Sequence, residues 1–528
     1  MKRFINISFL SLVFAGTALT GCNDDLTTSS YVKVNDEDVL GNVSQLEKVL
    51  TSAYKQLYFN TDKGDRVYAG LPGFQMYVDA SGADVISHTN MGGDQVTAYQ
   101  YSNSKTQADG NASKIWSMCY NVINRANIIL TNVDAAGDET QKKHIKGQAL
   151  AMRGIQYFHL IQNYQQTYVI AKSKRGVILR TSSDDESHKG FSTVEEVYTQ
   201  IVSDLTTAKT LLADYNPDDM WLINSKICSG ILARVYLVMQ NWDGAYNEAK
   251  IVYDQHSQLM TREQYRSGFD DMISGNYAEV VWAMKYTADN NLGGGTQFNF
   301  WFNQDASYGE GYADGPIYSF LDFFVDEQFV KLFEEKEDRY QFWKRTNNVN
   351  TEINTKWAFD KYKHYGEDGG SVIQSATRPE VCLMRGAEML LIMAEAAAQK
   401  GNSGEALNLL NRLQVARNAT PTTNAGGDAL LEDIYVERRK ELICEGQAGF
   451  YDLVRLQKRL VRIGESTTNP AGHYIWGMQY LNGYNALDPQ PIGTLESNDY
   501  RFFCQIPQME ILNNDAISEA DQNPWSGQ

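Results

Sequence analysis

The sequence predicts a mainly α-helical protein, in which pairs of helices form a right-handed scaffold that carries long irregular loops. Three observations support this prediction. Apolar residues recur at helical spacing over many segments. Two of these segments match the spacing of tetratricopeptide (TPR) helix pairs. Two long stretches rich in Gly, Asn, Asp and aromatic residues show no sustained period.

Four helices are expected in the first half of the chain. Their apolar residues repeat every three or four positions, which places them on one face of a helix. The first three helices are predicted over Val43–Leu57, Ile115–Val133 and Ile145–Tyr164. The fourth is predicted to begin at a capping box formed by Ser192 and Glu195.

Two further helix pairs follow the TPR spacing, with turns at Asn241–Gly244 and Gly401–Gly404. The residues that match are Leu232, Ala233, Tyr236, Ala245 and Ala249 in the first pair, and Leu390, Met393, Ala394, Ala397, Ala406, Leu410 and Leu413 in the second. The small residues allow the helices of a pair to approach closely, and the larger ones fill the layer between them. Because a stable stack needs about three repeats, the N-terminal helices are expected to supply the other units.

The two irregular regions, Gly64–Gly110 and roughly 260–380, are expected to be long loops. Ordered loops of such length usually carry function. One helix is expected inside the second region, with Pro316 in its first turn and a core of Phe320, Phe324, Phe329 and Phe333.

A charged helix hairpin is expected at Tyr435–Arg455. Arg438 shares a face with apolar residues, while Glu441 and Glu445 lie four positions apart and repel each other unless cations compensate them. Gly446 is expected to end the first helix. The second helix is expected to have Phe450, Leu453, Val454, Leu460 and Val461 on its apolar face.

The carboxylates of this hairpin allow two interpretations, an active site or an internal charge lock made of Arg438, Glu441, Glu445 and Arg455. Beside Arg438, neither glutamate has the apolar surroundings that raise the pKa of a catalytic acid. The chain contains no GxSxG, HExxH, GxxxxGK[ST] or GxGxxG motif, and its seven His residues are scattered. We therefore expect a structural lock, and no enzyme activity, cofactor or metal ion.

The N-terminus resembles the export signal of a bacterial lipoprotein. Lys2 and Arg3 precede an interrupted apolar run that ends in Leu-Thr-Gly-Cys22, and this ending resembles a lipobox. We expect cleavage after residue 21 and lipid on Cys22, with ordinary secretion as the alternative. Asn23-Asp24-Asp25 resembles the acidic tract that sends some lipoproteins to the outer face of the outer membrane.

The charge of the chain excludes polyanionic partners. Its formal charge is −18, and removal of residues 1–21 takes away two cations and no acid, which leaves −20. Such a chain is not suited to bind nucleic acid or anionic headgroups. The five remaining cysteines are 119, 228, 382, 444 and 504, an odd number with no CxxC pair. We therefore expect them to be buried as small apolar side chains, in preference to disulfides or metal ligands.

Several motifs resemble the SusD/RagB family of outer-membrane nutrient-binding lipoproteins. They are Trp116 with Tyr120 and Asn127, Ala151-Met152-Arg153 with Tyr157-Phe158, Leu232-Ala233-Arg234-Val235-Tyr236, Arg385 with Glu388, Ala394-Glu395-Ala396, Glu437-Arg438-Arg439-x-Glu441-Leu442 before Glu445-Gly446 and Asp452-Leu453, and the final Ile506-Pro-x-x-Glu510. The resemblance covers nearly the whole mature chain. Cys444 and Gln447-Ala448 depart mildly from the family pattern, which often has Phe and Arg there.

The resemblance implies a SusD-like fold and a non-catalytic receptor, anchored on the outer face of the outer membrane. Such a receptor captures a nutrient, here expected to be an oligosaccharide, and partners a SusC-type TonB-dependent transporter. The domain division expected from it is 1–21 signal, 22–41 lipidated tether, 42–259 N-terminal helical part and 260–528 C-terminal part, the last two forming one body.

The ligand site is expected in the irregular loops. Sugars offer apolar faces and many hydroxyl groups, so their sites combine aromatic platforms with polar donors and acceptors. The candidates are Asp84, Tyr99, Tyr101 and Asn103 in the first loop region, and Trp301, Asn303, Asp305, Tyr308 and Tyr312 in the second. Three alternatives stay open: a peptide-binding member of the family, a TPR adaptor lipoprotein without a small ligand, and a surface hydrolase, which the missing motifs disfavour.

Overall fold

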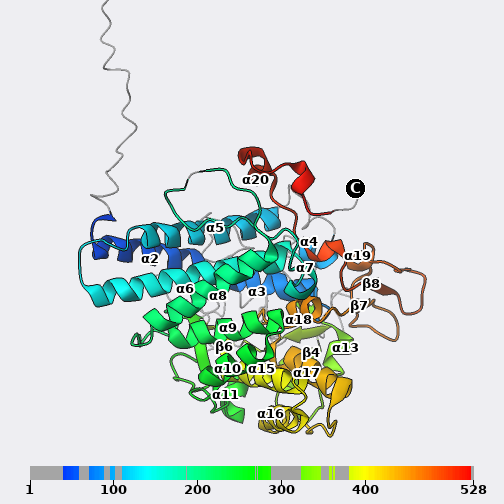
Figure 1. Cartoon of the computed structure of the whole chain (residues 1–528). Helices are drawn as coiled ribbons and strands as arrows, with labels where there is room; N and C mark the ends of the chain where they lie inside the picture. The colour runs from blue at the N-terminus through cyan, green and yellow to red at the C-terminus, as the bar shows by residue number, and fades with distance from the viewer. Residues whose placement is uncertain are drawn as a thin grey trace, which may run out of the picture.

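The fold is mainly α-helical, as the computed structural model of the chain shows (Figure 1). It describes residues 40–58, 70–87, 96–101, 110–185, 187–267, 269, 272–286, 323–345, 356–359, 361–362 and 380–524. The helices of the first half are α2 (Val43–Tyr58), α3 (Gly70–Ser81), α4 (Val96–Gln100), α5 (Gly110–Thr131), α6 (Glu139–Tyr164), α7 (Tyr168–Ala171), α8 (Val194–Leu211), α9 (Ser225–Met239), α10 (Trp242–Tyr253) and α11 (Arg262–Ser267). Those of the second half are α13 (Glu327–Val330), α15 (Gly386–Gln399), α16 (Ser403–Ala416), α17 (Gly427–Leu442), α18 (Phe450–Arg455), α19 (Ile475–Met478) and α20 (Gln508–Asn513).

The described strands form three small antiparallel sheets. They are β1 (Val85–Ser87), β2 (Val280–Lys285), β3 (Phe323–Val325), β4 (Trp343–Arg345), β5 (Trp357–Phe359), β6 (Glu380–Arg385), β7 (Leu460–Ile463) and β8 (Ile492–Leu495). The largest sheet has the order β1-β3-β5-β4, while β2 pairs with β6 and β7 with β8.

The long helices pack on one another in chain order. From α5 through α6, α8, α9 and α10 to α15, each helix contacts the next. In Figure 1, α5 lies near the top of the molecule, and α10 and α15 lie side by side in its lower part. The helices predicted from apolar periodicity correspond to α2, α5 and α6. The capping box of α8 lies one residue later than predicted, because Thr193 and Glu196 form it, with Thr193 N donating to Glu196 Oε2 over 2.7 Å.

Both segments with TPR spacing form helix pairs, α9 with α10 and α15 with α16. Gln240 leaves α9 in a left-handed conformation, and the side chain of Asn241 then accepts a hydrogen bond from Gly244 N at the start of α10. The matched residues Ala245, Ala249, Ala406 and Leu410 are buried. Since α10 also contacts α15, the two pairs pack against each other.

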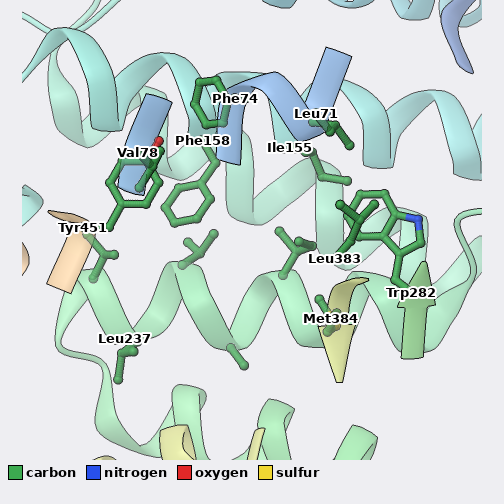
Figure 2. Close-up of a cluster of buried hydrophobic side chains, with 14 of the residues drawn as sticks. Leu71, Phe74, Val78, Ile155, Phe158, Leu237, Trp282, Leu383, Met384 and Tyr451 are labelled. Atoms are coloured by element: carbon green, nitrogen blue, oxygen red, sulfur yellow. The ribbon is translucent and has the colours of Figure 1, made fainter. Parts of the chain in front are cut away.

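The expectation of a continuous loop over Gly64–Gly110 is wrong for its described parts, which include α3, β1 and α4. Every residue of α3 is buried. Figure 2 shows the reason: Leu71, Phe74 and Val78 face Ile155 and Phe158 of α6 in a core that also receives Tyr451 of α18. A helix buried on all sides has no polar face, so its sequence shows no amphipathic period.

Two further predictions were wrong because short apolar runs suit helices and strands equally. Phe324, assigned to a helix core, lies in β3, which pairs with β1 and β5, and only the short α13 follows it. Pro316 and Phe320 lie outside the described residues. Leu460 and Val461, assigned to the second helix of the hairpin, lie in β7, where burial alternates along the strand.

The helix hairpin itself is present as α17 and α18. α17 ends at Leu442, four residues before Gly446, and both Cys444 and Gly446 then adopt left-handed conformations, with φ of 64° each. The five predicted buried cysteines are all free and buried. One continuous apolar cluster extends from Leu46 of α2 to Ile506 and Ile517 near the C-terminus, so it joins the two parts of the chain.

Candidate functional site

The sheet β1-β3-β5-β4 lies where the two predicted loop regions meet. Ser87, the last residue of β1, pairs with Phe323, the first residue of β3. The chain therefore leaves the sheet at Ser87, inside the first predicted loop region, and enters it again at Phe323, inside the second, at neighbouring points that lie far apart in sequence. The predicted ligand residues Asn103, Trp301, Asn303, Asp305, Tyr308 and Tyr312 lie outside the described residues, so their role stays a prediction.

Tyr99 and Tyr101 lie next to this sheet and are buried. The Tyr99 ring stacks on His473 with 16° between the planes, and the Arg462 guanidinium lies 4.3 Å from its centroid. Arg462 also lies 5.4 Å from the Tyr101 ring, and the Tyr101 hydroxyl donates to the Ser81 carbonyl. These two tyrosines therefore form part of the protein interior, and the contacts described for them are internal.

Asp84, the third described candidate, forms a bidentate ion pair with Arg439 of α17. Arg439 Nε lies 3.0 Å from Asp84 Oδ2, and Nη2 contacts Oδ1. The guanidinium also lies over the rings of Phe329 and Tyr435, at 5.6 and 5.4 Å. Asp84 is only 7% exposed, so this carboxylate links the start of β1 to the charged hairpin.

Arg462 of β7 holds the turn between α3 and β1. It is fully buried and donates to the carbonyl of Gly82 from both Nε (3.1 Å) and Nη2 (2.6 Å), to that of Ala80 (3.1 Å) and to that of Tyr99. Burial lowers the pKa of Arg462, yet guanidinium groups stay protonated in proteins. One cation thus fixes α3, β1 and α4 relative to one another.

The protonation of His473 follows from its two hydrogen bonds. Nε2 lies 3.0 Å from the Ala83 carbonyl oxygen, which can only accept, so Nε2 carries the proton. Burial, assisted by the charge of Arg462, lowers the pKa of His473 well below its usual value, so the ring is neutral. Nδ1 therefore accepts from the Tyr99 hydroxyl, 2.8 Å away.

One charged side chain follows β3 and another precedes β5, and the second links β5 to the segment around His473. Asp326 caps α13 by accepting from Gln328 N at 2.8 Å, and burial raises the pKa of Asp326 to about 7. Lys356, which precedes β5, donates to Glu465 over 2.8 Å and lies 4.3 Å from the Tyr474 ring centroid. These contacts give the sheet a rigid base.

The residues of the predicted charge lock are buried and ion-paired, but not with one another. Glu441 Oε1 lies 2.6 Å from Arg385 and 3.0 Å from Arg417, and Glu441 Oε2 lies 3.0 Å from Arg339. Glu445 pairs with Arg385 at 2.8 Å and with Lys361 at 2.7 Å.

The two arginines of the predicted lock form a separate cluster around Asp452. Arg438 Nε lies 2.7 Å from Asp452 Oδ2, and Arg455 Nε lies 2.6 Å from Oδ1. Arg455 also contacts Glu395 of α15 at 2.5 Å. The expected pairing of Arg438 with the glutamates is therefore wrong, because Asp452, 14 residues along the chain, lies closer.

The neighbouring cations keep both Glu441 and Glu445 ionised. Burial alone would raise the pKa of Glu441, but Arg417, Arg385 and Arg339 together hold it well below the usual range. The pKa of Glu445 is lowered in the same way by Arg385 and Lys361. A general acid needs a raised pKa, so neither group suits proton donation. Within the described parts of the chain no His, Cys, Asp and Glu side chains gather as a metal site, and no helix is long and apolar enough to cross a membrane.

Sequence reasoning missed Arg462, His473 and Asp326, which hold the base of the site. The partners of Arg462 and His473 are backbone carbonyls and rings that lie up to 390 residues away in the chain, whereas Asp326 caps α13 next to it. A single polar residue in a short strand or turn leaves no periodic signal, so only the fold identifies them.

The fold and the buried network define a helical scaffold protein with a small sheet built from segments of both predicted loop regions. Two family profiles match the sequence: one described as "Starch-binding associating with outer membrane" over residues 30–237, and one described as "SusD family" over residues 333–525. The chain belongs to the SusD/RagB family.

Individual relatives agree with this assignment. SusD-like protein P38 of Formosa agariphila is 24% identical over 543 aligned positions, which cover 91% of this chain and 97% of that protein. Among solved structures, a SusD-like carbohydrate binding protein from Bacteroides vulgatus is 27% identical, with a TM-score of 0.73 over 92% of this chain and 99% of its own. A surface glycan-binding protein from Bacteroides uniformis, 17% identical, shares the fold with a TM-score of 0.67 over 91% of this chain and 99% of its own.

Proposed function

We propose that this chain is a cell-surface lipoprotein that binds an oligosaccharide and delivers it to a SusC-type TonB-dependent transporter. The observation that carries the proposal is the likeness to the SusD-like carbohydrate binding protein of Bacteroides vulgatus, which extends over 99% of that protein. The family profile over residues 30–237, described as starch-binding and associating with the outer membrane, supports the same class of ligand and location.

In this proposal the described residues position the ligand site, and the loops contact the ligand. The sheet β1-β3-β5-β4 and the side chains of Arg462, His473 and Asp84 form a rigid base. Trp301, Tyr308 and Tyr312 would then stack on the apolar faces of sugar rings, while Asn103, Asn303 and Asp305 would bind hydroxyl groups. The site binds without catalysis and needs no cofactor.

Attachment to the membrane is assigned to lipid on Cys22. The mature chain has a formal charge of −20, so a charged surface would not hold it on an anionic bilayer. Cys22→Ser should therefore release the protein from the membrane fraction of cells without changing its affinity for glycan. Metabolic labelling with palmitate should mark the parent protein and leave the variant unlabelled, and a variant that stays membrane-bound would contradict the anchor.

The ligand site is tested by affinity electrophoresis on gels that contain starch, xylan, mannan or cellulose derivatives. Retention of the parent protein on at least one neutral polysaccharide is expected, and Trp301→Ala should abolish it. Trp242→Ala is the matched control, since it removes the same side chain from α10 of the helical scaffold. Equal retention of Trp301→Ala and the parent would overturn the assigned site, and retention on none of the gels would favour the peptide-binding alternative.

A further inference from the structure

A pocket on the helical scaffold has the composition of a sugar site. It lies between α2, the first turns of α6 and the segment that joins α8 to α9, and its volume is about 360 Å³. Its lining includes Glu47, Asp138, Gln141, His144, Tyr215 and Trp221. We call it the α2–α6 pocket. Its volume lies near the lower end of the range for small-ligand sites, which suits one or two sugar rings.

The α2–α6 pocket is separate from the sheet that carries the predicted loops. In Figure 1, α2 and the first turns of α6 lie at the left of the molecule, whereas α4 and β4 lie further to the right. Among the described residues, the lining contains none from the sheet β1-β3-β5-β4. A ligand in this pocket would therefore contact different elements from a ligand held by the loops.

The aromatic wall of the pocket is fixed in place. The Trp221 ring meets Tyr54 edge to face, with centroids 4.7 Å apart and planes at 85°, and meets Tyr58 similarly at 5.7 Å. The Trp221 carbonyl also accepts from Trp282 Nε1 over 3.1 Å. Because Trp221 is held before any ligand arrives, stacking on it would cost little ordering.

Polar groups beside this wall are also held in position. The Tyr54 hydroxyl donates to Gln148 Oε1 over 2.6 Å and accepts from Ile223 N over 2.8 Å. Gln141 Nε2 donates to Glu47 Oε2 over 3.1 Å. Amide, hydroxyl and carboxylate groups next to an aromatic ring are the combination that sugars require, with an apolar face on one side and hydroxyl groups around the edge.

The charge of the lining indicates which sugars fit. Glu47 and Asp138 contribute carboxylates, and the described lining includes neither Lys nor Arg. The neighbouring Lys143 is paired with Asp214 at 2.7 Å. The described lining also contains His144, whose Nε2 contacts Asp214 at 3.0 Å. An acidic or sulfated sugar would therefore meet the carboxylates of Glu47 and Asp138 without a cation to compensate them, so the pocket favours a neutral sugar.

We propose that the α2–α6 pocket is a second carbohydrate-binding site, which holds one or two rings of a neutral glycan against Trp221 and Tyr215. This inference rests on the proposed function in that it takes the ligand to be a glycan. A polymer held at two points binds more tightly than at either one, provided that one chain reaches both sites. The second site would thus keep a long glycan on the receptor while its end occupies the loops.

The test uses the full chain labelled with 5-fluorotryptophan and ¹⁹F NMR, in which Trp221→Phe, Trp242→Phe and Trp301→Phe assign three of the signals. The probes are maltohexaose, cellohexaose, xylohexaose and mannohexaose, with hexagalacturonate as the acidic comparison. We expect at least one neutral probe to shift the Trp221 signal, in the parent and in Trp301→Ala alike. The Trp242 signal, from α10, serves as the internal control and should not move.

Two variants separate loss of the site from loss of folding. Tyr215→Ala should raise by about tenfold the probe concentration that gives half of the full Trp221 shift, as expected for loss of one aromatic contact. Gln141→Ala removes only a polar contact at the rim and should raise that concentration less. A Trp221 signal that none of the four neutral probes moves, or that hexagalacturonate moves as strongly, would overturn the second site.

The two proposals fail in different ways in this experiment. If a probe moves the Trp301 signal but not that of Trp221, the second site is wrong while the proposed function stands. If a probe moves Trp221 but not Trp301, the second site stands and the assignment of the loop site is wrong.

Discussion

Arg385 and Glu445 form a fully buried ion pair although they lie 60 residues apart in the chain. Arg385 Nε lies 2.9 Å from Glu445 Oε2, and Nη2 lies 2.8 Å from Oε1. The same guanidinium contacts Glu279 at 2.8 Å and Glu441 at 2.6 Å. One arginine at the end of β6 therefore joins the segment before β2 to the charged hairpin.

Arg385→Ala should destabilise the protein strongly. The substitution leaves Glu279, Glu441 and Glu445 buried with fewer cations, and breaking a buried pair in this way costs about 3–5 kcal/mol. Unfolding by urea, followed by circular dichroism, measures the loss. Arg459→Ala is the control, because Arg459 and Glu496 form an exposed pair worth about 0–1 kcal/mol. A loss of less than about 1 kcal/mol for Arg385→Ala would contradict the role of the network.

Gly446→Ala should cost more than the same change at Gly427. The two glycines have nearly the same left-handed φ, 64° and 63°. Because an L side chain disfavours this conformation, each substitution should lower the free energy of unfolding by about 1–2 kcal/mol. A Cβ on Gly446 would lie 2.7 Å from the Gln75 Cα, whereas one on Gly427 would meet nothing within 4 Å. The clash should add about 1–3 kcal/mol.

The difference between the two glycine variants, measured by urea unfolding, isolates the contact between the Glu445-Gly446 turn and α3. That turn is further held by Gln75, whose Nε2 donates to the Glu445 carbonyl over 2.9 Å and to the Cys382 carbonyl over 3.0 Å. Equal losses for the two variants would mean that the turn moves away from α3 without penalty.

Helices with one buried face could be predicted from apolar periodicity. Helices α2, α5, α10 and α16 each present apolar residues every three or four positions, because their other face meets solvent. Helices α9 and α15 are buried over most of their length, and the spacing of their small and large residues predicted them instead. Helix α3 is the opposite case, since it is buried on every side and its sequence resembles a Gly-containing loop. Strand β3 is three apolar residues long, too short for any period to distinguish it from a helix turn.

The candidate site was harder to predict than the fold, because its partners come from distant parts of the chain. Asp84 was predicted to contact the ligand, and its described partner is Arg439, which lies 355 residues away in the chain. Tyr99 and Tyr101 have the residue type of sugar-binding platforms, yet Arg462 and His473 surround their rings. Residue type indicates the chemistry, and only packing determines whether a side chain faces a ligand.

Asp326→Asn should stabilise the protein at high pH. Burial raises the pKa of Asp326 to about 7 from about 3.8 in the unfolded chain, so the fold favours the protonated form. The contribution of the protonated Asp326 carboxyl to stability is fully present below pH 3.8, and it is lost as the pH rises through 7. At pH 8 the charged carboxylate therefore opposes folding, by up to about 4 kcal/mol, and an amide removes this cost.

The measurement is the stability difference between Asp326→Asn and the parent from pH 4 to pH 8, by urea unfolding. Groups that titrate alike in both proteins cancel, and Asn keeps the cap of α13. The difference should grow in favour of the variant as the pH rises. Asp138→Asn makes the same exchange at the exposed N-cap of α6 and serves as the control. A difference that stays constant from pH 4 to pH 8 would refute the expectation.

Arg438→Ala should prevent folding, because it removes one of the two cations that compensate Asp452. Arg438 is 2% exposed and Asp452 1%, so solvent cannot replace the lost charge. Breaking such a pair costs about 3–5 kcal/mol, a large share of the stability of a typical domain. The variant is expected to accumulate poorly and to be absent from the cell surface, as measured by surface proteolysis and immunoblotting.

The matched control for Arg438→Ala is Lys458→Ala, since Lys458 pairs with Glu432 at 2.6 Å on the surface and its loss should leave surface levels unchanged. The decisive result is the state of any Arg438→Ala protein that does reach the surface. If it is folded but no longer binds a polysaccharide that the parent binds, Arg438 belongs to the ligand site and not to the buried charge cluster. If it binds normally, the pair with Asp452 is dispensable, because the remaining contacts of Asp452 with Arg455 suffice to hold α18 in place.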